Sequence, residues 1–216
     1  MASDIGGIIG AVTRAVTRRE HNGRPAHVIV ASRSYDTAPE DVWDAITNPG
    51  RIPRWFLPVS GDLRLGGRYQ LQGNAGGEIT RCEPPRHLAV TWEYAGAVSW
   101  VTVELSDDGQ GGTHLSLEHL AHLDDHAKWE EFGPGAVGVG WDMTLMGLDR
   151  HLASGATVDR QQAMAWLGSP EGRDFIRHSS DDWCRASIAS GTEEVAAKAA
   201  AQRTTAAYTG EPPKDG

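Results

Sequence analysis

The sequence predicts an α+β protein in which one antiparallel sheet packs against a long helix. Between residues 59 and 121, apolar and polar residues alternate in short runs that are separated by turn sequences such as the one at 107–112. This is the pattern of neighbouring strands joined by tight turns. Over residues 137–153, apolar residues recur at helical spacing, and this stripe needs a sheet face to cover it.

The first residues form an N-terminal extension, which we place at 1–26. Apolar residues at helical spacing in 4–19 allow either a short amphipathic helix or the start of a strand. Arg14, Arg18 and Arg19 are expected to form a solvated helix face. Asn22 and Gly23 mark a turn, because both residues tolerate a positive φ angle.

A strand at 27–35 and two short helices precede the run of alternating residues. Thr37 is expected to cap the first helix with its side chain, and Pro39 suits the first helical turn. Asn48-Pro49-Gly50 ends this helix, and residues 51–56 form a second short turn. The predicted order is therefore one strand, two short helices, six strands and the long helix.

Two segments do not follow this simple plan. The glycine-rich run at 133–140 lacks the Lys-Ser/Thr ending of a phosphate-binding loop, so we interpret it as a mobile lid. We expect the whole connection at 121–136 to act as a gate. Residues 156–216 form a helical C-terminal extension with a disordered end, and Ser169-Pro170-Glu171 is a helix start within it.

Composition excludes several classes of protein. The chain of 216 residues has a formal net charge of −9, which argues against nucleic acid as the main partner. No run of apolar residues is long enough for membrane insertion, and the N-terminus lacks the features of a signal peptide. Two distant cysteines suit a reducing compartment, so we expect a cytoplasmic protein.

Short motifs in a fixed order carry a family resemblance. They are Ala38-Pro39-Glu40-x-Val42-Trp43, Ile52-x-x-Trp55-Phe56, Asp62-Leu63-x-x-Gly66-Gly67-x-Tyr69, Glu83-Pro84-Pro85-Arg86-x-Leu88, Thr113-x-Leu115-x-Leu117-x-His119 and Gly140-Trp141. With them, residues 27–155 resemble the branch of the START/SRPBCC superfamily that is similar to the activator of heat-shock-protein-90 ATPase. The resemblance implies a helix-grip fold, in which a curved antiparallel sheet of about seven strands wraps around a long C-terminal helix.

The same resemblance implies a cavity between the sheet and the last helix, on the order of several hundred Å³. Aromatic side chains from the second short helix, the strands and the last helix are expected to surround this space. Our candidate ligand-binding residues are Trp55, Trp92, His119, Trp141 and Leu145.

His119 continues the inward phase of Leu115 and Leu117, so its ring is expected to face the cavity. It is a candidate acid or base, although a structural histidine with satisfied hydrogen bonds is the interpretation we favour. His119, His122 and His126 have a metal-like spacing, but they combine a strand with a loop, and we predict no metal and no cofactor.

Three functions remain open at this point. The first is binding of a small hydrophobic molecule, such as a lipid or an aromatic, polyketide-like metabolite. The second is a cyclase or hydrolase that uses His119; the sequence does not establish catalysis, and we favour a binding protein over an enzyme. The third is a protein-interaction or co-chaperone-like role, in which the extension at 156–216 assembles a homodimer.

Overall fold

The computed structural model describes residues 5–123 and 128–211. Its strands are β1 (Thr13–His21), β2 (Arg24–Tyr35), β3 (Val59–Gly61), β4 (Arg68–Leu71), β5 (Gly76–Glu83), β6 (His87–Tyr94), β7 (Ala97–Asp107) and β8 (Thr113–His122). Its helices are α1 (Ile5–Gly10), α2 (Pro39–Thr47), α3 (Ile52–Trp55), α4 (Trp129–Phe132), α5 (Gly135–Ser154), α6 (Arg160–Leu167), α7 (Pro170–Ala189) and α8 (Glu194–Thr209).

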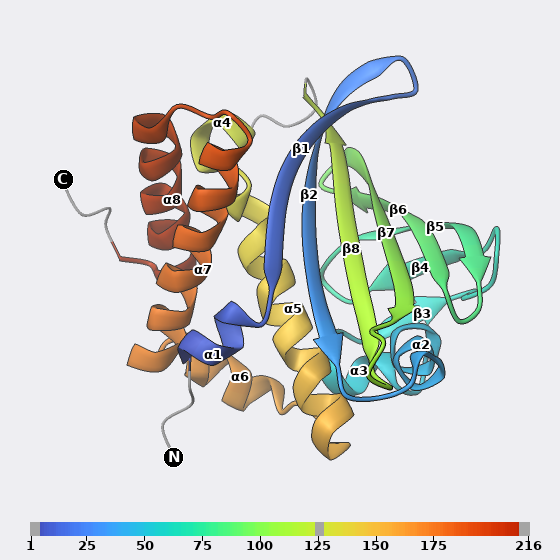
Figure 1. The fold of residues 1–216 in the computed structure, drawn as a ribbon. Coiled ribbons are helices and arrows are strands. Elements are labelled where there is room, and N and C mark those ends of the chain that lie inside the picture. Colours follow the sequence, from blue (N-terminus) through green and yellow to red (C-terminus); the bar gives the residue numbers. More distant parts are fainter. Residues whose placement is uncertain (1–4, 124–127, 212–216) are drawn as a thin grey trace.

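The strands form one curved antiparallel sheet in the order β1-β2-β8-β7-β6-β5-β4-β3. Strands β3 to β8 follow one another as a meander, and β2 closes against β8 with Ile29 opposite His119. The α+β class, the six consecutive strands and the long helix are confirmed (Figure 1).

Strand β1 adds an eighth strand to the described sheet, so the sheet reaches into the segment that was set apart as an N-terminal extension. Both alternatives for residues 4–19 occur, because α1 precedes β1. The expectation of a solvated helix face at Arg14, Arg18 and Arg19 is wrong about the helix and about Arg14, whereas Arg18 and Arg19 are exposed as expected. These residues lie on a strand, and the Arg14 side chain is only 4% exposed because strand alternation turns it inward.

Helix α2 begins at Pro39, as predicted, but Thr37 does not cap it. The residue before the helix is Ala38, which makes no side-chain cap, and the Thr37 hydroxyl donates to Asp41 Oδ2 instead. Helix α3 follows closely and ends at Trp55, whose indole Nε1 donates to Ala45 O of α2 at 2.9 Å. The two short helices therefore form one unit.

The glycine-rich run at 133–140 is not a lid. Most of it forms the first turns of α5, which begins at Gly135. Gly138 has to be glycine, because a Cβ there would lie 2.3 Å from the Trp183 ring of α7. Most of the described part of the predicted gate, 121–136, is regular structure, because β8 extends to His122 and α4 and α5 occupy the second half of the segment. Residues 124–127 lie outside the described residues.

The C-terminal extension forms the three helices α6, α7 and α8, and Ser169 caps α7 as expected by accepting from Gly172 N. Figure 1 shows α5 between the sheet and the layer of α7 and α8. Ile176 and Trp183 of α7 are fully buried in the main core together with residues of α5 and of the sheet. The extension therefore covers its own α5; the disordered end predicted after residue 211 lies outside the described residues.

Candidate functional site

A cavity of about 160 Å³ lies between the sheet, α5 and the α2–α3 unit. Among its lining residues are Trp55 of α3, Trp92 of β6, and Trp141 and Leu145 of α5. Four of the five candidate ligand-binding residues are thus brought together around one space. No residue of the C-terminal extension lines it, so the described part of the extension does not plug it.

The cavity is smaller than the several hundred Å³ that we expected. The reason is the size of the side chains that enter it. Trp92 and Trp141 pack against each other with ring centroids 5.1 Å apart, and Trp55 stacks on Phe56 at 5.6 Å. Aromatic rings that were expected to surround a wide pocket fill much of it themselves.

Almost all side chains that line the cavity are apolar. The hydroxyl groups among them make their hydrogen bonds within the protein. The hydroxyl of Thr144 donates to Gly140 O, that of Thr47 to Trp43 O and that of Tyr69 to Thr91 O. Burial raises the pKa of Tyr69 far above its ordinary value, so this phenol stays neutral. A ligand of this cavity therefore meets hydrocarbon and aromatic faces.

Trp92 is different from the other two tryptophans of the wall. The Nε1 of Trp55 and of Trp141 are both engaged in hydrogen bonds. The Trp92 Nε1, by contrast, makes no hydrogen bond to any described residue, and the side chain is half-buried. The Trp92 indole N–H can therefore still donate a hydrogen bond.

His119 does not line the cavity, although it is buried and on the inner face of the sheet as predicted. Its Nδ1 accepts from Trp141 Nε1 at 3.0 Å, and its Nε2 lies 2.8 Å from the Ser99 hydroxyl. Ser99 in turn donates to Trp92 O at 3.1 Å. Both ring nitrogens are used, so His119 orients Trp141 and leaves no nitrogen for a substrate.

The histidine spacing does not build a metal site. His119 points to the inner face of β8, whereas His122, three residues later, points to the outer face, and His126 lies outside the described residues. No group of three or more His, Cys, Asp or Glu side chains suited to a metal gathers in the part of the chain that the structure describes.

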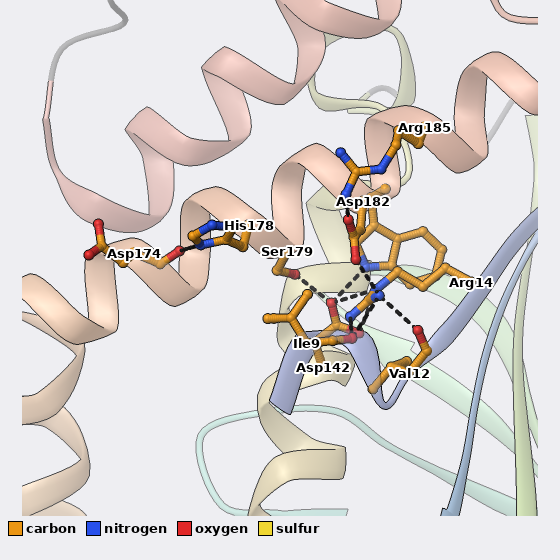
Figure 2. Close-up of polar contacts among 10 residues, drawn as sticks. Ile9, Val12, Arg14, Asp142, Asp174, His178, Ser179, Asp182 and Arg185 are labelled. Carbon is orange, nitrogen blue, oxygen red and sulfur yellow. Dashed lines mark hydrogen bonds and ion pairs between the residues drawn. The ribbon is translucent and has the colours of Figure 1, made fainter. Parts of the chain in front are cut away.

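A buried polar cluster was not found from the sequence. Figure 2 shows Asp142 of α5 with Arg14 of β1, Ser179 of α7 and the nearby Asp182. Trp183 of α7 also bonds to Asp142. Arg14 Nε lies 3.0 Å from Asp142 Oδ2, and Ser179 and Trp183 donate to the same oxygen at 2.5 Å and 3.1 Å. The only sequence signal was a charged residue within the apolar stripe of α5.

This cluster joins the sheet, α5 and α7, and it excludes water from its carboxylate. Burial raises the pKa of Asp142 above its ordinary value, although Arg14, Ser179 and Trp183 act in the opposite direction. Because Asp142 directly follows Trp141, the cluster fixes the rotation of α5 and with it the position of one cavity wall.

A curved antiparallel sheet that grips a long helix around an apolar cavity defines the helix-grip class of protein. The pattern of the family described as activator of Hsp90 ATPase homolog 1-like protein matches residues 36–153. The chain belongs to this family. In the described residues, no helix is long and apolar enough to cross a membrane.

Two solved structures of CalU16 from Micromonospora echinospora are similar over most of their length. The crystal structure is 37% identical, with a TM-score of 0.65, and covers 82% of this chain and 98% of CalU16. The solution structure is 35% identical, with a TM-score of 0.68, and covers 84% and 97%. MLL2253 from Mesorhizobium loti, 24% identical with a TM-score of 0.52 over 61% and 99%, shares the fold. No curated protein matches the chain.

Proposed function

We propose that this protein binds a small, uncharged, apolar molecule in the cavity between the sheet and α5. The observation that carries the proposal is the apolar wall, in which Thr47, Tyr69 and Thr144 satisfy their hydroxyls within the protein. An ionised ligand would lose its hydration there without gaining a partner, which is a large penalty.

The volume supports a compact ligand over a long acyl chain. A dry apolar cavity of about 150 Å³ accommodates a molecule the size of benzene. The flat faces of Trp92 and Trp141 favour an aromatic ring system, and the Trp92 Nε1 can donate to one carbonyl or ether oxygen of such a ligand. The cavity is partly open to the outside, so part of a ligand with more than one ring extends beyond it.

We do not propose catalysis by His119, because the imidazole bonds Trp141 and Ser99 and does not reach the cavity wall. A homodimer through the extension also lacks support, because Ile176 and Trp183 pack against α5 of the same chain.

The first test is native mass spectrometry of the protein purified from its own host, which detects a bound molecule directly. The second is titration with a neutral fluorescent probe, N-phenyl-1-naphthylamine. Val90→Phe adds a ring to the cavity wall and is expected to weaken probe binding by at least about tenfold. Val30→Phe places the same ring on the outer face of the sheet, and it should leave binding unchanged.

The proposal fails if the folded wild-type protein binds neither a host molecule nor the probe. It also fails if Val90→Phe and Val30→Phe bind the probe equally well, because the probe would then lie outside the cavity.

A further inference from the structure

Trp92 lies where the cavity meets solvent. It alternates along β6 with Leu88 and Val90, and all three side chains line the cavity from the inner face of the sheet. The Trp92 side chain is only half-buried. Its Nε1 is accessible to solvent, since this atom is neither buried nor bonded to any described residue. Because the cavity is partly open to the outside, we place Trp92 at the border of that opening.

The Trp92 indole is held in position by its neighbours. Its residue pairs with Ser99 of β7, and the Ser99 hydroxyl donates to Trp92 O at 3.1 Å. The indole packs against Trp141 of α5 at a centroid distance of 5.1 Å, and its centroid lies 6.1 Å from that of His119. An N–H on a ring that is already held can meet a ligand at a low cost in side-chain entropy.

The other side-chain N–H and O–H donors of the described wall are bonded within the protein. The Trp55 indole donates to Ala45 O at 2.9 Å. The Trp141 indole donates to His119 Nδ1 at 3.0 Å. Each hydroxyl of the wall donates to a backbone carbonyl. Among the described residues that line the cavity, Trp92 therefore has the N–H group that remains for a ligand.

The position of this N–H restricts the chemistry of its partner. An indole N–H donates but does not accept, so the partner is a hydrogen-bond acceptor. A carbonyl oxygen deep in the apolar part of the cavity would lose its hydration without gaining a donor, which is a penalty. The same oxygen at the opening can accept from Trp92 Nε1. A cavity of about 160 Å³ holds roughly one aromatic ring, so this oxygen belongs next to that ring.

We propose that Trp92 selects and orients the ligand by donating its indole hydrogen to an oxygen attached directly to the buried ring or one atom away from it. The ligand class is an uncharged aryl ketone, ester or ether, with the ring inside the cavity and the oxygen at the opening. Any further part of the molecule extends outside. This inference rests on the proposed function, because it requires that the cavity is occupied.

The accessibility of the Trp92 N–H can be tested without a ligand. Indole N–H groups give separate signals in heteronuclear NMR of isotope-labelled protein, and single Trp→Phe variants assign them. The Trp92 signal should exchange with solvent at least about tenfold faster than the signals of Trp55, Trp141 and Trp183. Those three N–H groups are bonded within the protein. Exchange of the Trp92 hydrogen that is as slow as theirs would overturn the inference.

The ligand test uses two molecules of the same shape. Acetophenone carries a carbonyl oxygen beside its ring, and α-methylstyrene has a methylene group in its place. Trp92→Phe keeps a ring and removes the N–H, so it should weaken acetophenone binding by about two- to tenfold more than α-methylstyrene binding. Trp55→Phe is the matched control, because its N–H is bonded to Ala45 O, and it should change both affinities by the same factor. NMR titration measures the affinities.

Wild-type protein provides a second readout that does not depend on the folding of a variant. Acetophenone should move the Trp92 N–H signal downfield and slow its exchange with solvent, because the hydrogen becomes bonded. α-Methylstyrene offers no acceptor, so it should leave that exchange rate unchanged.

The outcomes separate this inference from the proposed function. Equal weakening of both compounds by Trp92→Phe, or a Trp92 signal that does not respond to acetophenone, would mean that the indole only packs against the ligand. The inference would then be wrong while the proposed function stands. Binding of N-phenyl-1-naphthylamine without binding of acetophenone would also contradict the inference. If none of the three compounds binds to the folded wild-type protein, the proposed function itself fails.

Discussion

Arg14 and Asp142 form a buried ion pair between the first strand and the long helix, with Arg14 Nε 3.0 Å from Asp142 Oδ2 and side chains 4% and 1% exposed. They are 128 positions apart in the sequence. The pair is completed by Ser179 and Trp183 of the C-terminal extension, so three distant segments meet at one carboxylate.

Asp142→Ala should lower the free energy of unfolding by up to about 3–5 kcal/mol, because Arg14 would lose its most buried partner and keep only Asp182, and Ser179 and Trp183 would lose their acceptor. Urea denaturation measures the change. Replacing both partners with apolar residues, as in Arg14→Met with Asp142→Leu, should recover most of the loss. Glu118→Gln, which breaks the exposed pair with Arg19, is the control and should change stability by less than about 1 kcal/mol. A loss no larger than this control would contradict a structural role for the cluster.

The fold was predictable because its signals are local. The alternation of Leu115, Leu117 and His119 predicted their common face, and the turn at Asn22 and Gly23 is present with positive φ at both residues. Pro39 and Ser169 marked helix starts correctly. Each of these features depends on residues within a few positions of one another.

The site was predictable only in part, because its details depend on contacts between distant segments. Trp55, Trp92, Trp141 and Leu145 line the cavity as predicted, yet its volume depends on how their rings pack. The partner of Arg14 lies too far away in the sequence for any local pattern to reveal it. Likewise, the glycines at 133–140 resembled a flexible loop, because the indole that requires Gly138 belongs to α7.

Gly138→Ala should destabilise the protein by about 1–3 kcal/mol or more, because its methyl group would lie within 2.3 Å of the Trp183 ring. Gly140→Ala is the matched control, two residues later in the same helix. A Cβ there meets only the Tyr208 hydroxyl at 3.4 Å, and the gain in helix propensity is up to about 1 kcal/mol. Thermal unfolding distinguishes the two variants. Equal effects would mean that α7 does not pack against α5 as described.

His119→Ala should cost about 1–3 kcal/mol of stability, because the Trp141 indole and the Ser99 hydroxyl would both lose a buried partner. His114→Ala, on the opposite face of β8, removes a 3.4 Å contact with Ser34 and should change stability by less than about 0.5 kcal/mol. Chemical denaturation measures both. An unchanged stability together with lost probe binding would instead make His119 a ligand contact.

Cys82 allows the cavity to be monitored by chemical labelling, because its thiol lies in the cavity wall. Cys184 is buried, and burial raises the pKa of its thiol. A raised thiol pKa lowers the fraction of reactive thiolate at a given pH, so Cys184 should react slowly with a neutral maleimide and Cys82 should react first.

Saturating N-phenyl-1-naphthylamine should slow the labelling of Cys82 by about tenfold, since the occupied cavity excludes the reagent, and should leave Cys184 unaffected. Mass spectrometry of the Cys184→Ser variant follows the Cys82 reaction alone. If Cys82 is labelled at the same rate with and without saturating probe, the probe occupies another part of the molecule. Protection of Cys82 that disappears in Val90→Phe would link the labelled thiol, the probe and the cavity in a single measurement.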